Sequence, residues 1–385
     1  MLSAQQQQMV ISFAQEIIRI NSLSGHEKEV ANAIAAKMRS LDYDEVKFDP
    51  YGSVIGIRKG RHPGPRILFD GHMDVVEVQN PDAWAVPPFS GAIQDGKIWG
   101  RGASDMKGPL AAAVVTLGLV PRSEIYGTII LSASVNEEKH EGAALAKVME
   151  LTQPDFVVIC EPNGARLGIG QKGRAGITVS VTGTPAHSSV PHLGDNAMLK
   201  ACQVMERLED MPLPKDKILG DAIMVVIDGM SHPYPSRSTI PVEFFMHYDR
   251  RLVQNETQDS VMGLIQNGLI DLPDWKADYQ MIHMPAYTGV ELTEVDFHPA
   301  WVIDTKSPWI QKAQTGLRKA GVEPVFGTAQ FCTNGSYSAG VAGVPTMIFG
   351  PSSGMLAHCQ DEYIEVSELL QGAEGYWGLV SELGK

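Results

Sequence analysis

Two adjacent glutamates, Glu137 and Glu138, have the residue type and position that most strongly suggest chemistry. They follow the apolar run 128–135, which is typical of a buried strand. Neighbouring carboxylates at the end of such a strand repel each other and lose hydration, which is unfavourable unless a proton or a cation compensates the charge. The pair therefore indicates a site that binds metal and moves protons.

Other imidazole and carboxylate side chains could share that site. They are His72 and Asp74 after the apolar run 66–69, Asp105 in a glycine-rich loop, Glu161 after the run 156–159, and His358 near the C-terminus. Ligands bind beyond the carboxyl ends of the strands in an open α/β sheet, so residues that follow strands can converge at one edge. Mixed imidazole and carboxylate ligands suit Zn²⁺, with Mn²⁺ or Co²⁺ also possible. The pattern indicates a two-metal hydrolase, although a His-x-Asp alone is more often a surface turn.

The segments that must position these side chains alternate between strands and helices. We predict strands at 54–57, 66–69, 128–135, 156–159 and 346–349, and helices at 8–19, 24–41, 107–119 and 308–320. Ser24 is expected to cap the second helix, with Glu27 as the partner in a capping box. Continuous apolar strands between helices indicate an α/β fold with a mostly parallel sheet flanked by helices.

The pattern changes after Gly173, where the run 177–182 alternates apolar and polar residues like a half-exposed strand. A helix at 196–208, strands at 222–227 and 241–248, a helix at 257–269 and a last strand at 279–284 complete a β-α-β-β-α-β order. This is the order of ferredoxin-like α+β domains. We therefore predict a catalytic domain in two parts, 1–174 and 291–385, interrupted by an inserted domain at 175–290.

Bulk properties limit the classes of partner. A chain of 385 residues is long enough for two domains. The formal net charge of −14 argues against a nucleic acid or an anionic membrane as partner, because either would need a basic face. The N-terminal segment lacks the pattern of a signal peptide, and the four cysteines lack CxxC spacing. We expect a cytoplasmic protein with reduced thiols.

Five short motifs carry a resemblance to a known family. They are Gly71-His72-Met73-Asp74, Gly100-Arg101-Gly102-Ala103-Ser104-Asp105-Met106-Lys107-Gly108, Asn136-Glu137-Glu138, Glu161-Pro162 and Ala357-His358. In this order they resemble the M20 family of metallopeptidases and amidohydrolases, which includes acetylornithine deacetylase, succinyl-diaminopimelate desuccinylase, aminoacylase and glutamate carboxypeptidase. The resemblance covers nearly the whole chain. Segments 332–335 and 249–251 are also similar to a hydrolase branch linked with selenium metabolism.

The resemblance implies a zinc-peptidase type of fold with two Zn²⁺ ions. One ion would be bound by His72, Asp105 and Glu161, and the other by Asp105, Glu138 and His358, with Asp105 bridging. A metal-bound hydroxide would attack the amide, Glu137 would act as general base and acid, and Asp74 would orient His72.

The resemblance also implies roles for residues of the inserted domain. His187 would stabilise the oxyanion, and in dimeric members of the family such a histidine reaches the site of the other subunit. The residues alone favour a different reading, in which His187 is a turn histidine held by neighbouring hydroxyls. Arg174 and Arg251 are candidates for binding a substrate carboxylate, although Arg251 could instead pair with Asp249 or Glu256.

Asn334-Gly335 is a candidate substrate loop. Many relatives have Asp-Gly there, and many have Asn where this chain has Ser238, so the substrate specificity of relatives does not carry over. We expect an amidohydrolase that acts on an N-acyl amino acid, like a deacetylase or desuccinylase, and forms a homodimer through the inserted dimerisation or lid domain. The alternative within the family is a metallo-dipeptidase or carboxypeptidase acting on short peptides. A non-catalytic binding protein and a two-metal phosphoesterase are competing hypotheses, which the complete ligand set and the lack of a phosphate-binding glycine loop disfavour.

Overall fold

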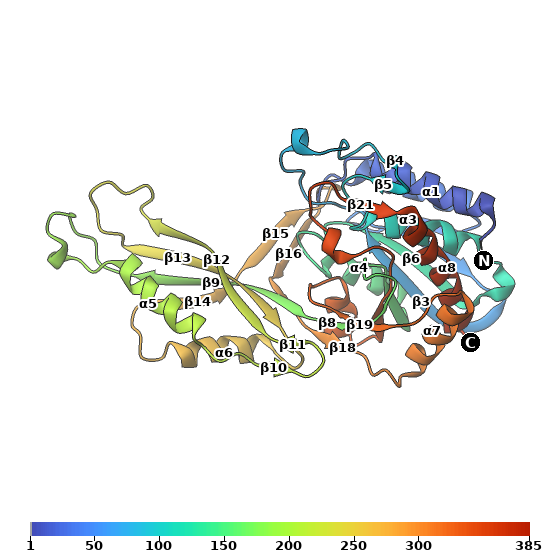
Figure 1. Cartoon of the computed structure of the whole chain (residues 1–385). Helices are drawn as coiled ribbons and strands as arrows, with labels where there is room; N and C mark the ends of the chain where they lie inside the picture. The colour runs from blue at the N-terminus through green and yellow to red at the C-terminus, as the bar shows by residue number, and fades with distance from the viewer. Residues whose placement is uncertain (1) are drawn as a thin grey trace. The chain divides into compact units, whose positions relative to one another are not determined.

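The computed structural model describes residues 2–385, which separate into two compact units (Figure 1). The large unit comprises the chain up to Gln171 together with His283–Thr293 and Val302–Lys385. The small unit comprises Lys172–Ile282 and Glu294–Trp301. Each unit has its own cluster of buried apolar side chains.

A nine-stranded sheet forms the centre of the large unit. Its strands run in the order β1 (Glu45–Phe48), β2 (Val54–Lys59), β6 (Tyr126–Ser134), β3 (His62–His72), β7 (Phe156–Ile159), β20 (Thr346–Ile348), β8 (Leu167–Gln171) and β18 (Trp301–Val302), with β19 (Phe326–Ala329) also paired to β8. The four neighbouring strands β6, β3, β7 and β20 are parallel, whereas β1 and β2 are antiparallel additions at one side. The prediction of a mostly parallel α/β sheet is therefore confirmed.

Helices pack against both faces of this sheet. They are α1 (Ala4–Ile18), α2 (Lys28–Ser40), α3 (Lys107–Leu119), α4 (Ala143–Thr152), α7 (Pro308–Lys319) and α8 (Val366–Leu383). Helix α3 contacts β3, β6, α1 and α8, and its small apolar residues are buried on all sides. Successive side chains of a strand face opposite ways. Gly71 faces Met106 and Leu110 on the α3 side, so its neighbour Asp70 points to the opposite face, where α4 packs on β6.

Helix α2 begins at Lys28, four residues later than the predicted start at residue 24. Its N-cap position is occupied by Glu27, which makes no capping hydrogen bond, and the proposed capping box with Ser24 is wrong. Instead, the Ser24 hydroxyl donates to Asp74 Oδ2 at 2.7 Å, and Glu27 Oε1 accepts from the backbone N–H of Asn136 at 3.1 Å. Both side chains therefore support loops that follow β3 and β6.

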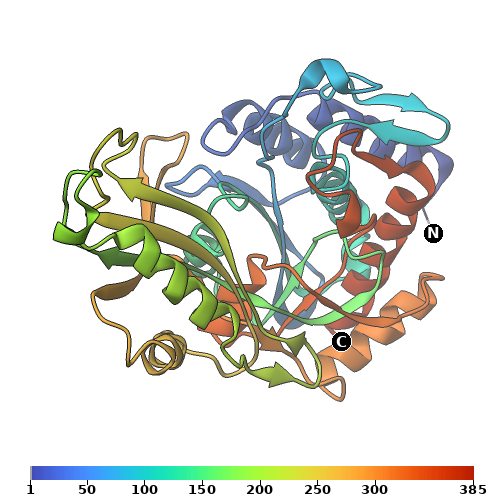
Figure 2. The ribbon, with the colours of Figure 1, turned by 60° about the vertical axis from the view of Figure 1, so that its left-hand side comes forward.

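The small unit has a five-stranded antiparallel sheet in the order β12 (Ile223–His232), β13 (Glu243–Leu252), β9 (Gly173–Thr182) and β14 (Trp275–Tyr279), with the short strand β17 (Phe297–His298) also paired to β9. Helices α5 (Ala197–Glu209) and α6 (Gln258–Gly268) contact each other and share its apolar core (Figures 1 and 2). The chain order β9-α5-β12-β13-α6-β14 is the predicted ferredoxin-like one.

The last predicted strand of this unit was placed too late in the chain. The last strand of the ferredoxin-like order is β14, which pairs with β9 and in which alternate residues beginning at Trp275 are half-buried. The apolar-polar alternation continues into β15 (Met281–Pro285), which forms a separate two-stranded sheet with β16 (Glu291–Val295). Two consecutive alternating segments were therefore read as one strand in the wrong position.

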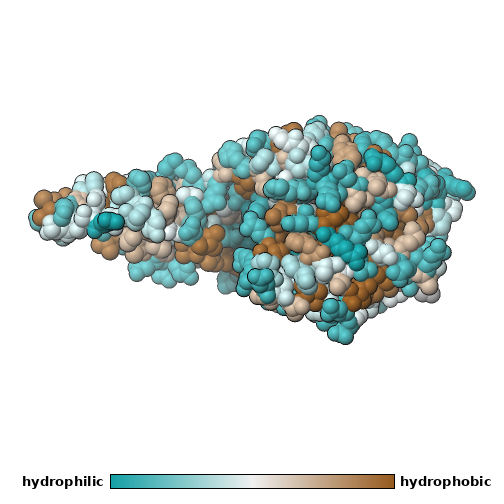
Figure 3. Space-filling view, turned by 90° about the horizontal axis from the view of Figure 1, so that it is seen from above, coloured by the Kyte–Doolittle hydropathy of each residue, from teal (hydrophilic) through white to brown (hydrophobic). Residues whose placement is uncertain are grey.

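Shorter elements complete both units. They are the three-stranded sheet of β4 (Ala92–Gln94), β5 (Lys97–Trp99) and β21 (Tyr363–Glu365), the pair β10 (Lys215–Asp216) and β11 (Gly220–Asp221), strand β17 (Phe297–His298), the π-helix η4 (Ser336–Val341), and the 3-10 helices η1 (Pro81–Ala83), η2 (Arg122–Glu124), η3 (Pro191–Leu193) and η5 (Gly354–Leu356). Among residues 2–385, no helix combines the length and apolar character needed to cross a membrane. Hydrophilic and hydrophobic residues are mixed over the face seen in Figure 3.

Candidate metal centre

The ends of three adjacent parallel strands bring the predicted ligands together. His72 is the last residue of β3 and lies beside Ser134, the last residue of β6, so Glu137 and Glu138 follow at the same edge. Asp70 of β3 is paired with Ile159, the last residue of β7, and Glu161 follows two residues later. The sheet register therefore explains why side chains from three distant parts of the sequence converge.

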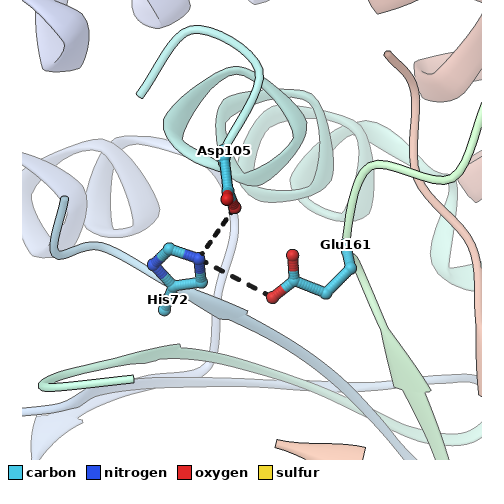
Figure 4. A group of neighbouring side chains, drawn as sticks. All are labelled: His72, Asp105 and Glu161. Carbon is cyan, nitrogen blue, oxygen red and sulfur yellow. Dashed lines mark hydrogen bonds and ion pairs between the residues drawn. The ribbon is translucent and has the colours of Figure 1, made fainter. Parts of the chain in front are cut away.

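A first group of donors is formed by His72, Asp105 and Glu161. Nε2 of His72 lies 3.1 Å from Asp105 Oδ1 and 3.7 Å from Glu161 Oε1. Figure 4 shows both carboxylates directed at the same nitrogen of the imidazole ring, Asp105 from the loop before α3 and Glu161 from the loop after β7. One imidazole nitrogen and two carboxylates thus face a common point.

A second group uses the same aspartate. Asp105, Glu138 and His358 have ligand atoms within 4.8 Å of one another. Nε2 of His358 lies 2.9 Å from Glu138 Oε2 and 3.5 Å from Asp105 Oδ2. Since the two oxygens of Asp105 face different histidines, this carboxylate lies between the two groups.

Glu137 lies beside the first group but belongs to neither. Its Oε2 is 3.9 Å from His72 Nε2, and its side chain is 8% exposed. A carboxylate next to a set of ligands, and not part of it, is in a suitable position to exchange protons with a reactant held there.

The protonation behaviour of the centre reflects crowded negative charge. Burial and the nearby Glu161 charge raise the pKa of Glu137 well above its ordinary value. Burial and the charge of Asp105 raise the pKa of Glu138 to about 7. Burial alone would lower the pKa of His72, but the charges of Glu137 and Glu161 raise it. The carboxylates hold positive charge at the imidazole and destabilise one another's ionised forms.

These residues fit a pair of divalent cations. Imidazole nitrogen with carboxylate oxygen is a donor set used for Zn²⁺, and two donor groups sharing one carboxylate suit two ions. Glu138 Oε1 supports this reading, because it is buried without a hydrogen-bond partner among the described residues. A cation would satisfy that oxygen and compensate the repulsion that raises the pKa of Glu138.

Asp74 contacts more than its predicted partner. The His72 Nδ1 nitrogen is 3.0 Å from the backbone carbonyl of Asp74 and 3.5 Å from its carboxylate. The two carboxylate oxygens accept from the backbone N–H groups of Glu137 and Glu138, each at 3.1 Å. The Asp74 side chain therefore fixes the loop that carries both glutamates, while its carbonyl is the nearer acceptor for the imidazole.

Glu362 is a supporting residue that sequence reasoning missed. Its carboxylate is fully buried and accepts from the backbone N–H groups of Ser104 and Asp105 at 2.8 and 2.9 Å. It also accepts from Gly102 N–H at 3.1 Å and from Arg101 Nη1 at 2.6 Å. The Glu362 side chain thus holds the loop that carries Asp105. Glu362 itself lies four residues after His358 in the sequence. The only sequence signal was an acidic residue next to the last motif.

The predicted substrate loop is held by the protein itself. The side-chain amide of Asn334 donates to Asp70 Oδ2 at 2.8 Å, and its oxygen accepts from Gly142 N–H at 2.6 Å. The N–H of Gly335 donates to the hydroxyl of Thr333 at 3.0 Å. Both polar ends of the Asn334 side chain therefore anchor this loop to β3 and to the start of α4.

The remaining predicted residues lie in the small unit. Arg251 forms an ion pair with Asp249 at 2.7 Å, one of the two alternatives considered for it, whereas Glu256 pairs with the buried Arg250. Arg174 donates to Asp296 Oδ1 at 2.8 Å. His187 is exposed, and its Nδ1 lies 2.7 Å from the Ser189 hydroxyl. These three side chains have aspartate or serine partners within their own unit.

This chain is similar in sequence and in fold to known proteins. A sequence profile of peptidase family M20/M25/M40 matches residues 68–382, which include every ligand described above. The uncharacterised protein YgeY of Escherichia coli strain K12 is 30% identical over 383 residues, covering 94% of this chain and 92% of its own length. A probable succinyl-diaminopimelate desuccinylase of Staphylococcus aureus strain MSSA476 is 26% identical over 389 residues, covering 92% of each chain. The crystal structure of the aminopeptidase PepT from Bacillus cereus ATCC 10987 has a TM-score of 0.75 at 19% identity, covering 98% of this chain and 99% of its own, and shows the same fold.

Proposed function

Because the chain belongs to peptidase family M20/M25/M40, and is a metal-dependent hydrolase of amide or peptide bonds, we propose that it uses two zinc ions to deacylate an N-acyl amino acid. The observation that carries this proposal is the sharing of Asp105 by two donor groups with the Glu137 carboxylate beside them. The relative named as a probable desuccinylase supports an acylated amine as the substrate class.

The donor groups would hold the two ions with little excess charge. His72, Asp105 and Glu161 would bind one ion, and Asp105, Glu138 and His358 the other. Three carboxylates compensate most of the charge of two divalent cations and leave a net positive centre, which favours an anionic nucleophile and a developing oxyanion. When bound, the ions would lower the pKa of water and polarise the amide carbonyl.

Glu137 would move the protons. Its carboxylate would accept a proton from the attacking water and deliver it to the leaving nitrogen, so one residue acts in turn as base and acid. Burial raises the pKa of Glu137 above that of an ordinary glutamate, which makes its carboxylate a stronger base for this transfer. The backbone N–H of Glu137 donates to Asp74, which holds the carboxylate in place beside His72.

We further propose that His187 donates a hydrogen bond to the oxyanion. The backbone N–H of Ser189 can only donate, and it points at His187 Nδ1 at 3.1 Å. Nδ1 is therefore an acceptor in the neutral ring, and the hydrogen is carried by Nε2. The Nε2–H group would be the donor that meets the substrate.

The experiment that tests the proposed function is amine release from a substrate panel after removal of metal by a chelator. The panel contains N-acetyl, N-succinyl and N-carbamoyl amino acids and dipeptides, each assayed with and without added Zn²⁺. We expect zinc-dependent release from the acylated amino acids. Release from dipeptides alone would favour the metallo-dipeptidase or carboxypeptidase alternative, and no release by protein shown to contain two ions would overturn the deacylase proposal.

We also propose a homodimer through the small unit. Strand β12 is at the edge of its sheet and exposes large apolar side chains, among them Ile227 at 65% and Met230 at 53%. An exposed apolar edge strand is a surface that a second chain can cover by strand pairing.

Sedimentation equilibrium at micromolar concentration should give twice the chain mass of 41.8 kDa. Ile227→Glu should shift the protein to monomer, because it places a charge in the covered strand. Ile270→Glu is the matched control, since Ile270 is 78% exposed in the same unit and outside the sheet. A monomeric wild-type protein, or equal effects of both variants, would contradict the proposal.

A further inference from the structure

A cavity of about 570 Å³ lies within the large unit, separate from the donor groups but connected to them along the chain. Its walls include Pro162, which follows Glu161, and Met355, which precedes His358 by three residues. The wall residue Ser353 accepts through its carbonyl from the hydroxyl of Ser104, the neighbour of Asp105, at 3.1 Å. Two ligand segments of the centre therefore continue into the wall of this cavity, and a third is hydrogen-bonded to that wall.

The lining of the cavity is mostly apolar. Pro162, Phe331, Ile348 and Met355 contribute hydrocarbon surface. Met355 is 85% exposed, so a large apolar side chain stands at the rim with little protein against it. Exposed apolar groups that surround a concave site are typical of ligand-binding surfaces.

Glycines keep the cavity open. A Cβ atom on Gly354 would lie 2.9 Å from Cε1 of Phe331, and one on Gly327 would lie 3.3 Å from Cδ of Arg166. Side chains at these two positions would push against the walls. The width of the cavity therefore depends on residues without side chains.

Arg166 is the cationic group of this lining. The two arginines that sequence reasoning favoured for carboxylate binding already have partners, Arg174 with Asp296 and Arg251 with Asp249. Among the described residues, no carboxylate forms an ion pair with Arg166, and its exposed side chain lies across Gly327. A planar guanidinium beside apolar walls matches an aliphatic or aromatic group that ends in a carboxylate.

We propose that this cavity, the Arg166 pocket, binds a carboxylate-bearing part of the substrate, with the carboxylate on Arg166 and the hydrocarbon against Phe331 and Met355. The proposal rests on the proposed amide hydrolysis and names the chemistry that the substrate must carry. The carboxylate can come from a dicarboxylic acyl group or from the amino acid that is released. The test separates these two sources.

The experiment compares two substrate pairs that differ only in one carboxylate. N-succinyl-leucine against N-butyryl-leucine tests the acyl side, and N-acetyl-leucine against N-acetyl-leucinamide tests the amine side. In one of the two pairs, Arg166→Ala should lower kcat/KM for the substrate with the carboxylate roughly tenfold or more. In the same pair, kcat/KM for the neutral substrate should fall less than about twofold. Arg166→Lys should restore part of the loss, because it returns the charge without the planar fork.

Arg39→Ala is the matched control, because Arg39 is exposed on α2 and outside the cavity lining, and its loss changes the net charge equally. The proposed role of the Arg166 pocket would be overturned if Arg166→Ala lowered kcat/KM equally for both members of both pairs, or for none of the substrates. In the first case the substitution would act on the fold or on the centre, and in the second the pocket would lie outside the path of the substrate.

Binding measured by calorimetry separates failure of the pocket from failure of the proposed function. The ligands are N-succinyl-leucine and N-acetyl-leucinamide, titrated into wild-type protein and Arg166→Ala under conditions in which neither is cleaved. Weaker binding of the carboxylate ligand by the variant, without any hydrolysis by wild type, would retain the pocket and reject the deacylase. Hydrolysis by wild type with identical binding by both proteins would retain the deacylase and reject the pocket.

Discussion

Glu137→Gln is expected to lower kcat by ~10²–10⁴-fold, which is the usual contribution of a positioned general acid–base group. Glutamine keeps the size of the side chain and the backbone hydrogen bond to Asp74, so the loop should stay in place. It cannot accept the proton of the attacking water. Because Glu137 lies outside both donor groups, the variant should retain the full metal content. Turnover is measured with the best substrate of the panel, and metal per chain by elemental analysis.

Glu150→Gln provides the matched control for this variant. Glu150 is exposed on α4 and pairs with Lys147, so its substitution removes the same charge at a distance from the chemistry. Its kcat should stay within about twofold of wild type, since surface substitutions of this kind have small effects. Near-normal turnover of Glu137→Gln would refute the role of Glu137 as base, and loss of metal in that variant would make it a ligand instead.

The convergence of His72, Glu138 and Glu161 could be predicted because each lies at or just beyond the carboxyl end of a strand in the parallel part of one sheet. Side chains beyond the carboxyl ends of neighbouring parallel strands must lie near one another. Helix α3 was also predicted with its observed bounds, since its small apolar residues lie between the glycine-rich loop and Pro121. Asp105 and His358 follow no strand, and only the order of the motifs connected them with the centre.

The supporting shell could not be predicted, because its partners are far apart in sequence. Glu362 accepts from the N–H of Ser104, a residue 258 positions earlier. Ser24 and Glu27 were assigned to a capping box by a local pattern, but tertiary hydrogen bonds to Asp74 and Asn136 use both side chains. A buried carboxylate that accepts several backbone N–H groups leaves no periodic signal. Such residues become visible only when the loops they hold are placed in space.

The second large effect is expected from Asp105, because it is shared by both donor groups. Its Oδ1 lies 3.1 Å from His72 Nε2 and its Oδ2 lies 3.5 Å from His358 Nε2. Asparagine preserves the shape but replaces one anionic oxygen by an NH₂ group, which cannot act as a ligand. Asp105→Asn should therefore weaken the binding of both ions and reduce the metal content from about two ions per chain to below one. Metal per chain after dialysis against a weak chelator measures this. The activity should fall to the level of the metal-free protein.

Variants of the unshared ligands show whether Asp105 is the bridge. Glu161→Gln should remove the ion held with His72, and Glu138→Gln the ion held with His358, so each should retain about one ion per chain. The three variants remove the same charge from the same centre, so a general electrostatic effect would reduce metal binding equally in all of them. Only a ligand that belongs to both groups makes Asp105→Asn lose more metal than either single-group variant. If Asp105→Asn kept one ion, and Glu138→Gln or Glu161→Gln lost both, the shared ligand would have to be a different carboxylate, and the pairing of donors described here would be wrong.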